Sequence, residues 1–343
     1  MIPIPNRSIE AEARARQRVL TKPAGSLGRL EDLACWLAGR LGEVTPQMPR
    51  CEIFVFASDH GVANRGVSAY PQSVTEQMVH NFTRGGAGIN VLGRLTDARI
   101  EVVDVGVASD EPTPTGARAA RIGRGTRDLS RESAMTDAQV SQALEIGARC
   151  VEEGYSRGSR LLIAGEMGIG NTTAAACLIC ALTGASPAEL VGRGTGIDDV
   201  VLARKQAIVA NALQRISASA QKAPLRVLAE FGGFELAAIV GVYLAAARRG
   251  VPVLLDGYLS SAAALVAVAI EPNARDWMLA SHLSTEQGHA TALRALEMEP
   301  LLDLKLRLGE GTGAALALSI VRAALALHRE MATFAQAGVS GPV

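Results

Sequence analysis

The chain has 343 residues, of which 48% are apolar but only 3% aromatic, and its 34 acidic and 34 basic side chains leave no net charge. This length allows one large domain or two modest ones, with a core built mainly from Ala, Val, Leu and Ile. A neutral chain argues against the basic surface that nucleic-acid binding needs, so no nucleic-acid partner is expected.

The sequence also argues against a membrane or a disulfide-stabilised secreted protein. The N-terminus, MIPIPNRSIEAEARARQ, is polar and lacks the apolar core of a secretory signal. The longest apolar runs, LAAIVGVYLAAA and SAAALVAVAI, are shorter than the roughly 18 residues of a spanning helix. The five cysteines are scattered, and the CxxC of Cys177 and Cys180 lies in an apolar helical run, which predicts core packing. We therefore expect a soluble cytoplasmic protein.

Short apolar runs that end in Gly, Ser or Asp alternate along the chain with segments of helical periodicity. The predicted strands are 52–61, 100–106, 161–168, 251–257 and 277–282, and the predicted helices include 84–95, 137–154, 172–182, 199–212 and 234–248. This alternation predicts an α/β fold, a mostly parallel sheet flanked by helices in a Rossmann-like three-layer arrangement. In such folds ligands bind beyond the carboxyl ends of the strands, so the residues after each run are the ones of interest.

The two ends of the chain carry helical patterns without strands. Residues 6–40 and 285–335 are of this kind, which predicts a small helical domain made from 1–39 plus 285–343 beside a large α/β domain at 40–284. Residues 107–135 are rich in Gly, Pro, Arg and Asp and are predicted to form a long loop.

Two glycine-rich segments are candidate anion sites. GEMGIGNTT (165–173) lies between a strand and a helix, where glycines let a ligand approach the backbone and the helix start offers free N–H groups. A tight strand-to-helix turn is the plainer alternative, and the segment fits neither the Walker A nor the GxGxxG pattern. In GRGTGIDDVVLARK (192–205), Asp198 or Asp199 can cap a helix, and Lys205 either lies on a solvated face or faces an anion pocket.

Two acidic motifs allow more than one interpretation. Asp59 and His60 of ASDHGV could form a metal site or an acid–base pair, but the five histidines are dispersed without HxxxH or HExxH spacing. Loop hydrogen bonding is the commoner use, and no metal is expected. Glu310 of RLGEGTGAALAL stands between two glycines, where a helix-start role is worth about 0.3–1 kcal/mol. That role leaves the flanking glycines unexplained, so a catalytic base stays open.

Taken together, the motifs form an ordered set: TKPAGSLGRLE, ASDHGV, VTEQMVHNFTRGGAGINVL, GEMGIGNTTAAA, LLDGYLSSAAAL, SHLSTEQGH and RLGEGTGAALAL. With them the chain closely resembles the nicotinate-nucleotide–dimethylbenzimidazole phosphoribosyltransferases of cobalamin biosynthesis. The resemblance implies transfer of phosphoribose from nicotinate mononucleotide to 5,6-dimethylbenzimidazole, giving α-ribazole 5′-phosphate and nicotinate with inversion. It also implies a parallel α/β domain, a small helical domain made from both chain ends, and a homodimer.

The resemblance also implies roles for individual residues. Glu310 matches the catalytic base, and Glu166 a second acidic residue near the reacting centre. The positions implied to bind substrate are Gly168, Asn171 and Thr172 at the ribose phosphate, Gly194 and Lys205 at the phosphate, Asp256 and Ser284 on the nucleotide side, and Leu308 and Gly309 at the base. The chain departs from better-known members at Tyr70 and Met78, where Ser and Gln are usual. This makes the wall beside the base more apolar, so dimethylbenzimidazole is the first choice, with adenine or another benzimidazole as alternatives.

The chemistry of the implied reaction fits a single base. The pyridinium of nicotinate mononucleotide loses its charge as it leaves, so it needs no general acid, and no pyrophosphate is present to call for Mg²⁺; no cofactor is expected. The incoming benzimidazole becomes cationic and gives up one ring proton, which a carboxylate can accept. The helix dipole lowers the pKa of Glu310 and desolvation raises it, and the sequence does not decide between them. A non-catalytic azole or riboside binder and a nicotinamide-dependent oxidoreductase are the rival functions.

Overall fold

The computed structural model describes residues 1–343 except residue 195, residues 218–222 and residues 342–343. At its centre is a six-stranded sheet in the order β3-β2-β1-β4-β5-β6, and every neighbouring pair is parallel. The strands are β1 (Cys51–Ser58), β2 (Arg99–Gly106), β3 (Ala117–Ala119), β4 (Leu161–Met167), β5 (Val253–Leu255) and β6 (Met278–Ala280). The predicted parallel α/β fold is confirmed. The strand order reverses between β1 and β4, which is where such sheets bind ligands.

Both faces of the sheet are buried, as an all-parallel sheet requires. Alternate residues of β1 enter different cores: Phe54 and Phe56 pack on one face, Ile53 and Val55 on the other. The first face carries α5 (Asp137–Ser156), α10 (Phe234–Arg249) and α11 (Tyr258–Ile270), and the second carries α3 (Val74–Thr83), α4 (Gly88–Leu95) and α13 (Thr312–Glu330).

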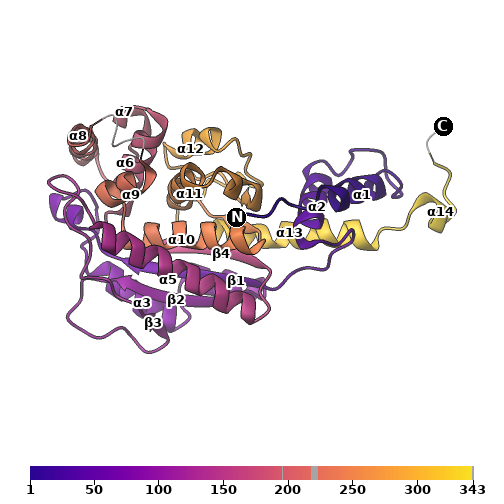
Figure 1. Cartoon of the computed structure of the whole chain (residues 1–343), viewed down its shortest axis with the longest axis horizontal. Coiled ribbons are helices and arrows are strands. Elements are labelled where there is room, and N and C mark those ends of the chain that lie inside the picture. Colours follow the sequence, from indigo (N-terminus) through magenta and orange to yellow (C-terminus); the bar gives the residue numbers. More distant parts are fainter. Residues whose placement is uncertain (195, 218–222, 342–343) are drawn as a thin grey trace.

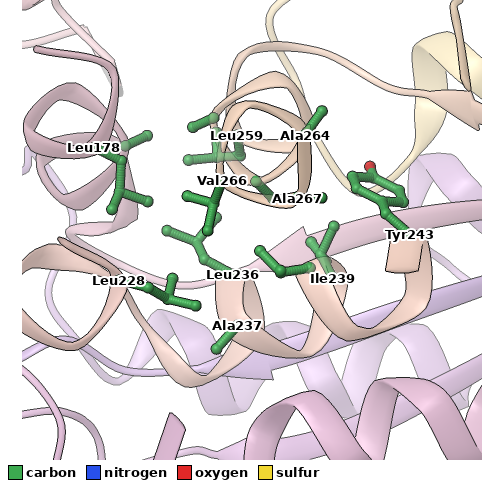
Figure 2. Packing of buried hydrophobic residues seen from close by; sticks show 14 of the residues in the cluster. Leu178, Leu228, Leu236, Ala237, Ile239, Tyr243, Leu259, Ala264, Val266 and Ala267 are labelled. Carbon is green, nitrogen blue, oxygen red and sulfur yellow. The ribbon is translucent and has the colours of Figure 1, made fainter. Parts of the chain in front are cut away.

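A further group of helices extends the first face beyond α10 and α11. These are α6 (Asn171–Thr183), α7 (Pro187–Leu190), α8 (Asp199–Gln214), α9 (Pro224–Phe231) and α12 (His289–Ala295). Figure 2 shows Leu236 and Ile239 of α10 facing Val266 and Ala267 of α11, with Leu178 of α6 at the side of the same core. Small side chains let these helices approach closely, which suits a chain with few aromatic residues.

The two ends of the chain lie together. α1 (Arg7–Gln17) and α2 (Arg29–Leu41) lie beside the distal part of α13, and α14 (Phe334–Ala337) follows it (Figure 1). Leu37 of α2 shares a buried cluster with Ile53 of the sheet and with Ala315 of α13. Because this packing is continuous, the division into domains at 40–284 and at 1–39 plus 285–343 stays a proposal.

Some element predictions were wrong in detail. The predicted loop 107–135 contains β3, a three-residue edge strand whose sequence, ARA, carries no apolar alternation. The helix predicted over 84–95 begins later, at Gly88, and residues 84–87 form the turn that follows α3, which ends at Thr83. Gly85 adopts a positive φ of 79° in this turn. In the part of the chain that the structure describes, no helix is both long and apolar enough to cross a membrane.

We predict that Gly147→Ala lowers the free energy of unfolding by about 1–3 kcal/mol, because a Cβ atom there would overlap the carbonyl oxygen of Ala238 where α5 crosses α10. Urea denaturation measures the change. Gly123→Ala is the control, since its Cβ would meet the ring of Phe234 at an ordinary 3.5 Å. Equal stability of the Gly147 variant and the wild type would contradict the close helix crossing.

Candidate active site

A pocket of about 500 Å³ opens at the carboxyl ends of β4, β5 and β6, beside the point where the strand order reverses. It collects residues from segments far apart in the sequence. Of the predicted site residues, the structure brings to its wall Tyr70, Met78, Glu166, Gly168, Asn171, Thr172, Gly194, Asp256, Ser284, Leu308, Gly309 and Glu310. Lys205 is the exception, because it lies behind the wall and reaches it through Thr172.

The loop that carries Glu310 has an unusual backbone. Gly309, Glu310 and Gly311 have φ values of 85°, 63° and 91°, so three successive residues are left-handed. Glycine adopts this conformation freely, whereas a glutamate in it is strained by roughly 1–3 kcal/mol. A Cβ atom at Gly165 of β4 would overlap the Glu310 carbonyl, so the loop rests directly on the strand backbone.

Asp256, not Glu310, caps the helix that follows this loop. Its carboxylate accepts hydrogen bonds from the backbone N–H groups of Gly311, at 3.3 Å, and Ala314, at 3.0 Å, in the first turn of α13. The Glu310 Oε2 atom accepts the backbone N–H of Ile89 at 3.2 Å, at the start of α4 instead. The interpretation of Glu310 as a device that starts its own helix is therefore wrong.

Glu310 is held at one oxygen and open at the other. Glu310 is buried, with 5% of its surface exposed. Its Oε1 atom makes no hydrogen bond within the described parts of the chain. Burial raises the pKa of Glu310. The hydrogen bond from Ile89 lowers this pKa, and the nearby negative charge of Asp256 raises it further. Desolvation therefore outweighs the hydrogen bond from Ile89, and the net shift of the pKa is upward.

Glu166 lies on the other side of the Gly309 loop. Its Oε2 accepts a hydrogen bond from the Asn171 amide, and a side chain at Gly309 would overlap its Oε1. Burial, and then the negative charges of Glu235 and Asp256, raise the pKa of Glu166 to about 8. Burial among other carboxylates therefore favours the protonated form of Glu166 in the unliganded pocket.

A buried cation lies behind the pocket wall. Lys205 is 1% exposed, and its Nζ atom donates to Thr172 Oγ1 at 2.8 Å and to the Gly192 carbonyl at 3.4 Å. No described carboxylate forms an ion pair with it. Burial lowers the pKa of Lys205 to about 8, and the more distant charge of Glu286 opposes this shift only in part. This burial excludes the solvated-face alternative for Lys205. The helix that carries it is capped by Asp198, whose carboxylate accepts the N–H of Val201 at 2.8 Å.

Part of the pocket wall is apolar. Tyr70 precedes α3, and Val74 and Met78 lie one turn apart on that helix, so their side chains share a face that lines the pocket. Leu308 belongs to the same lining and approaches the start of α4 at Gly88. The pocket therefore combines an apolar wall and several carboxylates with a buried cation behind Thr172.

The comparisons with known proteins agree along the whole chain. A family model described as "Phosphoribosyltransferase" matches residues 2–339. The nicotinate-nucleotide–dimethylbenzimidazole phosphoribosyltransferases of Chromobacterium violaceum and Chloroflexus aggregans are 53% and 51% identical to it; each alignment covers 96% of this chain, and 95% and 93% of the relative. The crystal structure of CobT from Thermus thermophilus superposes with a TM-score of 0.94 at 47% identity, covering 98% of this chain and 100% of that one.

The chain belongs to the nicotinate-nucleotide–dimethylbenzimidazole phosphoribosyltransferase family. This confirms the resemblance found in the sequence. The roles of individual residues are not decided by family membership and remain proposals.

Further residues of the quoted motifs lie at or beside the pocket, although the sequence had not marked them as site residues. His282 of SHLSTEQGH lines the pocket, with Nε2 3.8 Å from Asp256 Oδ1. His289 of the same motif accepts the backbone N–H of Ser284 at Nδ1, which leaves Nε2–H to donate to Ser261 at 3.0 Å. Burial lowers the pKa of His289 to about 3, so the ring stays neutral. Arg307, just before the Glu310 loop, lies at the pocket mouth and donates to the Gly194 carbonyl at 2.8 Å.

The remaining motifs lie away from the pocket surface. Asp59 accepts the N–H of Ala108 at 2.8 Å, the loop hydrogen bond expected for it, while His60 is fully buried. No group of three or more His, Cys, Asp or Glu side chains within the described ranges could hold a metal ion. Cys177 and Cys180 are free and buried, as predicted.

We predict that Lys205→Met stabilises the unliganded protein by about 1–3 kcal/mol at pH 7, because it removes a buried charge that forms no ion pair with the described residues. The pKa of Lys205 is lower in the folded state, about 8, than its ordinary 10.5. The charge therefore destabilises the fold in full below pH 8, and less and less as pH rises to 10.5. Denaturation at pH 7 and near pH 10 should show the gain shrinking.

Lys22 supplies the matched control for this prediction. It is nearly as buried, but its Nζ atom pairs with Glu31 at 2.7 Å. Lys22→Met breaks this pair and leaves Glu31 without its partner, so it should not stabilise the protein. A loss of stability in Lys205→Met would show that the charge is compensated in the unliganded state.

Proposed function

We propose that this chain transfers the phosphoribosyl group of nicotinate mononucleotide to 5,6-dimethylbenzimidazole, forming α-ribazole 5′-phosphate and nicotinate in the nucleotide-loop assembly of cobalamin biosynthesis. The relatives that carry this name are about half identical to it over nearly their full length. The observation that carries the proposal is the geometry of Glu310: one carboxylate oxygen is fixed by Ile89, and the other is free beside an apolar wall.

The bond changes follow from this placement. The bond between C1′ and the pyridinium nitrogen breaks, and its electron pair neutralises the leaving nicotinate ring. A ring nitrogen of the benzimidazole forms the new bond to C1′ from the opposite face, which inverts the configuration. The other ring nitrogen gives its proton to Glu310, so no charge accumulates on the product. Proton transfer of this kind contributes roughly 10²–10⁴-fold, and alignment of the two substrates supplies much of the rest.

The proposed nucleotide end uses the cation and the second acid. Lys205, Thr172 and the backbone at Gly194 are placed to receive the phosphate, whose charge would pair with the otherwise uncompensated lysine. Glu166 and Asp256 flank the space between this end and Glu310. Their negative charge would favour the positive charge at C1′ in the transition state. A cationic pyridinium in this space would lower the pKa of Glu166, so nucleotide binding should drive its ionisation.

The base end supports dimethylbenzimidazole as the first choice. Tyr70 and Met78 line it and offer a methylated ring an apolar surface. Adenine or another benzimidazole is the alternative in the same reaction, and an assay that offers several bases at once ranks them. The rival binder function is tested by calorimetry together with product analysis, because a binder retains the azole without forming a riboside.

We also propose a homodimer in the cytoplasm. Val91 and Leu95 lie one turn apart on α4 and are both more than half exposed, which supports an apolar contact surface. Sedimentation velocity tests the oligomeric state.

The function itself is tested by incubating the purified protein with nicotinate mononucleotide and dimethylbenzimidazole. Release of nicotinate together with α-ribazole 5′-phosphate is the expected result. Absence of turnover with every benzimidazole and purine offered would overturn the proposal.

We predict that Glu310→Gln lowers kcat by roughly 10²–10⁴-fold, because the amide can still accept the Ile89 N–H but cannot take up a proton. Steady-state kinetics measures the loss, and circular dichroism confirms the fold. Glu189→Gln is the control, since Glu189 also accepts a backbone N–H, that of Ser186 at 3.1 Å, outside the pocket. Near-normal turnover of the Glu310 variant would return this residue to a structural role.

We predict that kcat falls on the acid side at a pH above 4.5, the ordinary pKa of a glutamate. Burial raises the pKa of Glu310, and the ionised form that acts as base disappears as pH falls through this raised value. The residual kcat of Glu310→Gln should not show this fall at acid pH. Protonation of the free benzimidazole would instead lower the rate of both proteins, so the comparison distinguishes the two causes. A wild-type kcat that stays constant down to pH 4.5 would contradict the prediction.

A further inference from the structure

A buried ion pair lies beneath the pocket and takes no part in the proposed chemistry. His60, just after β1, and Glu235, in the first turn of α10, are both fully buried, and His60 Nε2 lies 2.7 Å from Glu235 Oε1. His60 Nδ1, Glu235 Oε2 and Asp59 Oδ1 are buried without a hydrogen-bond partner in the described chain. Burying such a pair with unmet hydrogen bonds is unfavourable, so a purely structural role explains it poorly.

The pair contacts the turn that carries the proposed nucleotide site. A Cβ atom at Gly168 would lie 3.5 Å from His60 Cδ2, and one at Gly170 would lie 3.3 Å from His60 Cβ. Gly233, just before α10, lies against the other side of the imidazole, where a Cβ atom would overlap His60 Cε1. His60 is therefore held between the start of α10 and the turn that separates Glu166 from α6.

The charges around Glu166 come from several elements. Glu235 faces it from α10, Asp256 from the end of β5, and Glu310 from the loop before α13, while Asn171 donates a hydrogen bond from α6. Around Glu235 the charged and titratable groups are Glu166 itself and, after β1, His60 and Asp59. Glu235, His60 and Asp59 do not line the pocket, so substrate does not reach them.

We propose that the His60–Glu235 pair is a positioning unit of the active site, which supports the Gly168–Gly170 turn from below and sets the electrostatic environment of Glu166. The expected effect of the pair on catalysis rests on the proposed function, whereas its expected effect on the ionisation of Glu166 does not. The Glu235 carboxylate makes ionisation of Glu166 harder, and positive charge on the imidazole would offset part of that effect. Glu235 favours that positive charge, because it raises the pKa of His60 despite the burial of the ring.

The test measures ionisation of Glu166 directly, in the unliganded protein. The infrared band of protonated carboxylic acids is followed against pH, and the component that disappears in Glu166→Gln is assigned to Glu166. In Glu235→Gln, which keeps the side-chain shape, the midpoint of Glu166 should fall by about one pH unit, since a like charge has been removed. In His60→Gln, whose amide can still donate to Glu235, the midpoint should rise.

These opposite shifts distinguish an electrostatic positioning role from simple structural support. Glu230→Gln is the matched control: Glu230 is a buried carboxylate on the neighbouring helix α9, paired with Arg215 at 3.1 Å. It should leave the Glu166 midpoint unchanged. Unchanged midpoints, or shifts in the same direction, in both variants of the pair would overturn the proposal. If one variant fails to fold, the sign of the shift in the other still decides.

Kinetics connects the result to function. The pH dependence of kcat/KM for nicotinate mononucleotide should move with the Glu166 midpoint, down in Glu235→Gln and up in His60→Gln. Wild-type protein without turnover would refute the proposed function but leave the infrared titration valid. Normal turnover with an unmoved pH profile and unmoved midpoints would refute the positioning role alone.

Discussion

The carboxylate of Asp256 is the contact on which the base end of the site depends. By accepting the N–H groups of Gly311 and Ala314, it ties the end of β5 to the first turn of α13. The start of α13 fixes the left-handed loop before it, and this loop aims Glu310 at the start of α4. The Asp256 carboxylate thus joins the sheet to α13 directly, and to α4 through Glu310. Each of these carboxylates is held by backbone N–H groups, which fixes the position of the proposed base.

The charges of the pocket are arranged for a ligand and not for the stability of the empty protein. Three carboxylates line the pocket, and burial raises the pKa of each of them, while behind the wall lies a buried lysine that forms no ion pair with the described residues. Each feature destabilises the unliganded state, and each is relieved by a molecule with a cationic centre and an anionic phosphate. Native proteins tolerate such conflicts at functional sites, because the remaining core supplies the stability.

The sequence predicted most of the sheet but only part of the site. Strands with long apolar runs, such as 161–168, were recognisable, whereas β3 was not, because three residues at a sheet edge carry no periodic signal. Asp256 and Glu310 were identified as candidates, yet the cap that Asp256 provides joins residues 55 or more positions apart and leaves no local pattern. The burial of Lys205 and the left-handed backbone of Glu310 are likewise products of tertiary packing. Local physics favoured a helix-start role for Glu310, and only the ordered motifs pointed to chemistry.

The glycines near Glu310 allow close backbone contacts and a left-handed backbone, and the site does not depend on their flexibility. Gly165 lets the loop rest on β4, and Gly309 leaves room for the Glu166 carboxylate, so a methyl group at either position would displace a proposed catalytic side chain. Gly311 supplies the left-handed residue that begins α13. A site fixed in this way is already organised before substrate binds, which reduces the reorganisation that the reaction requires. Because the pyridinium leaves without help, such rigid placement of two substrates and one base accounts for the catalysis that the fold has to provide.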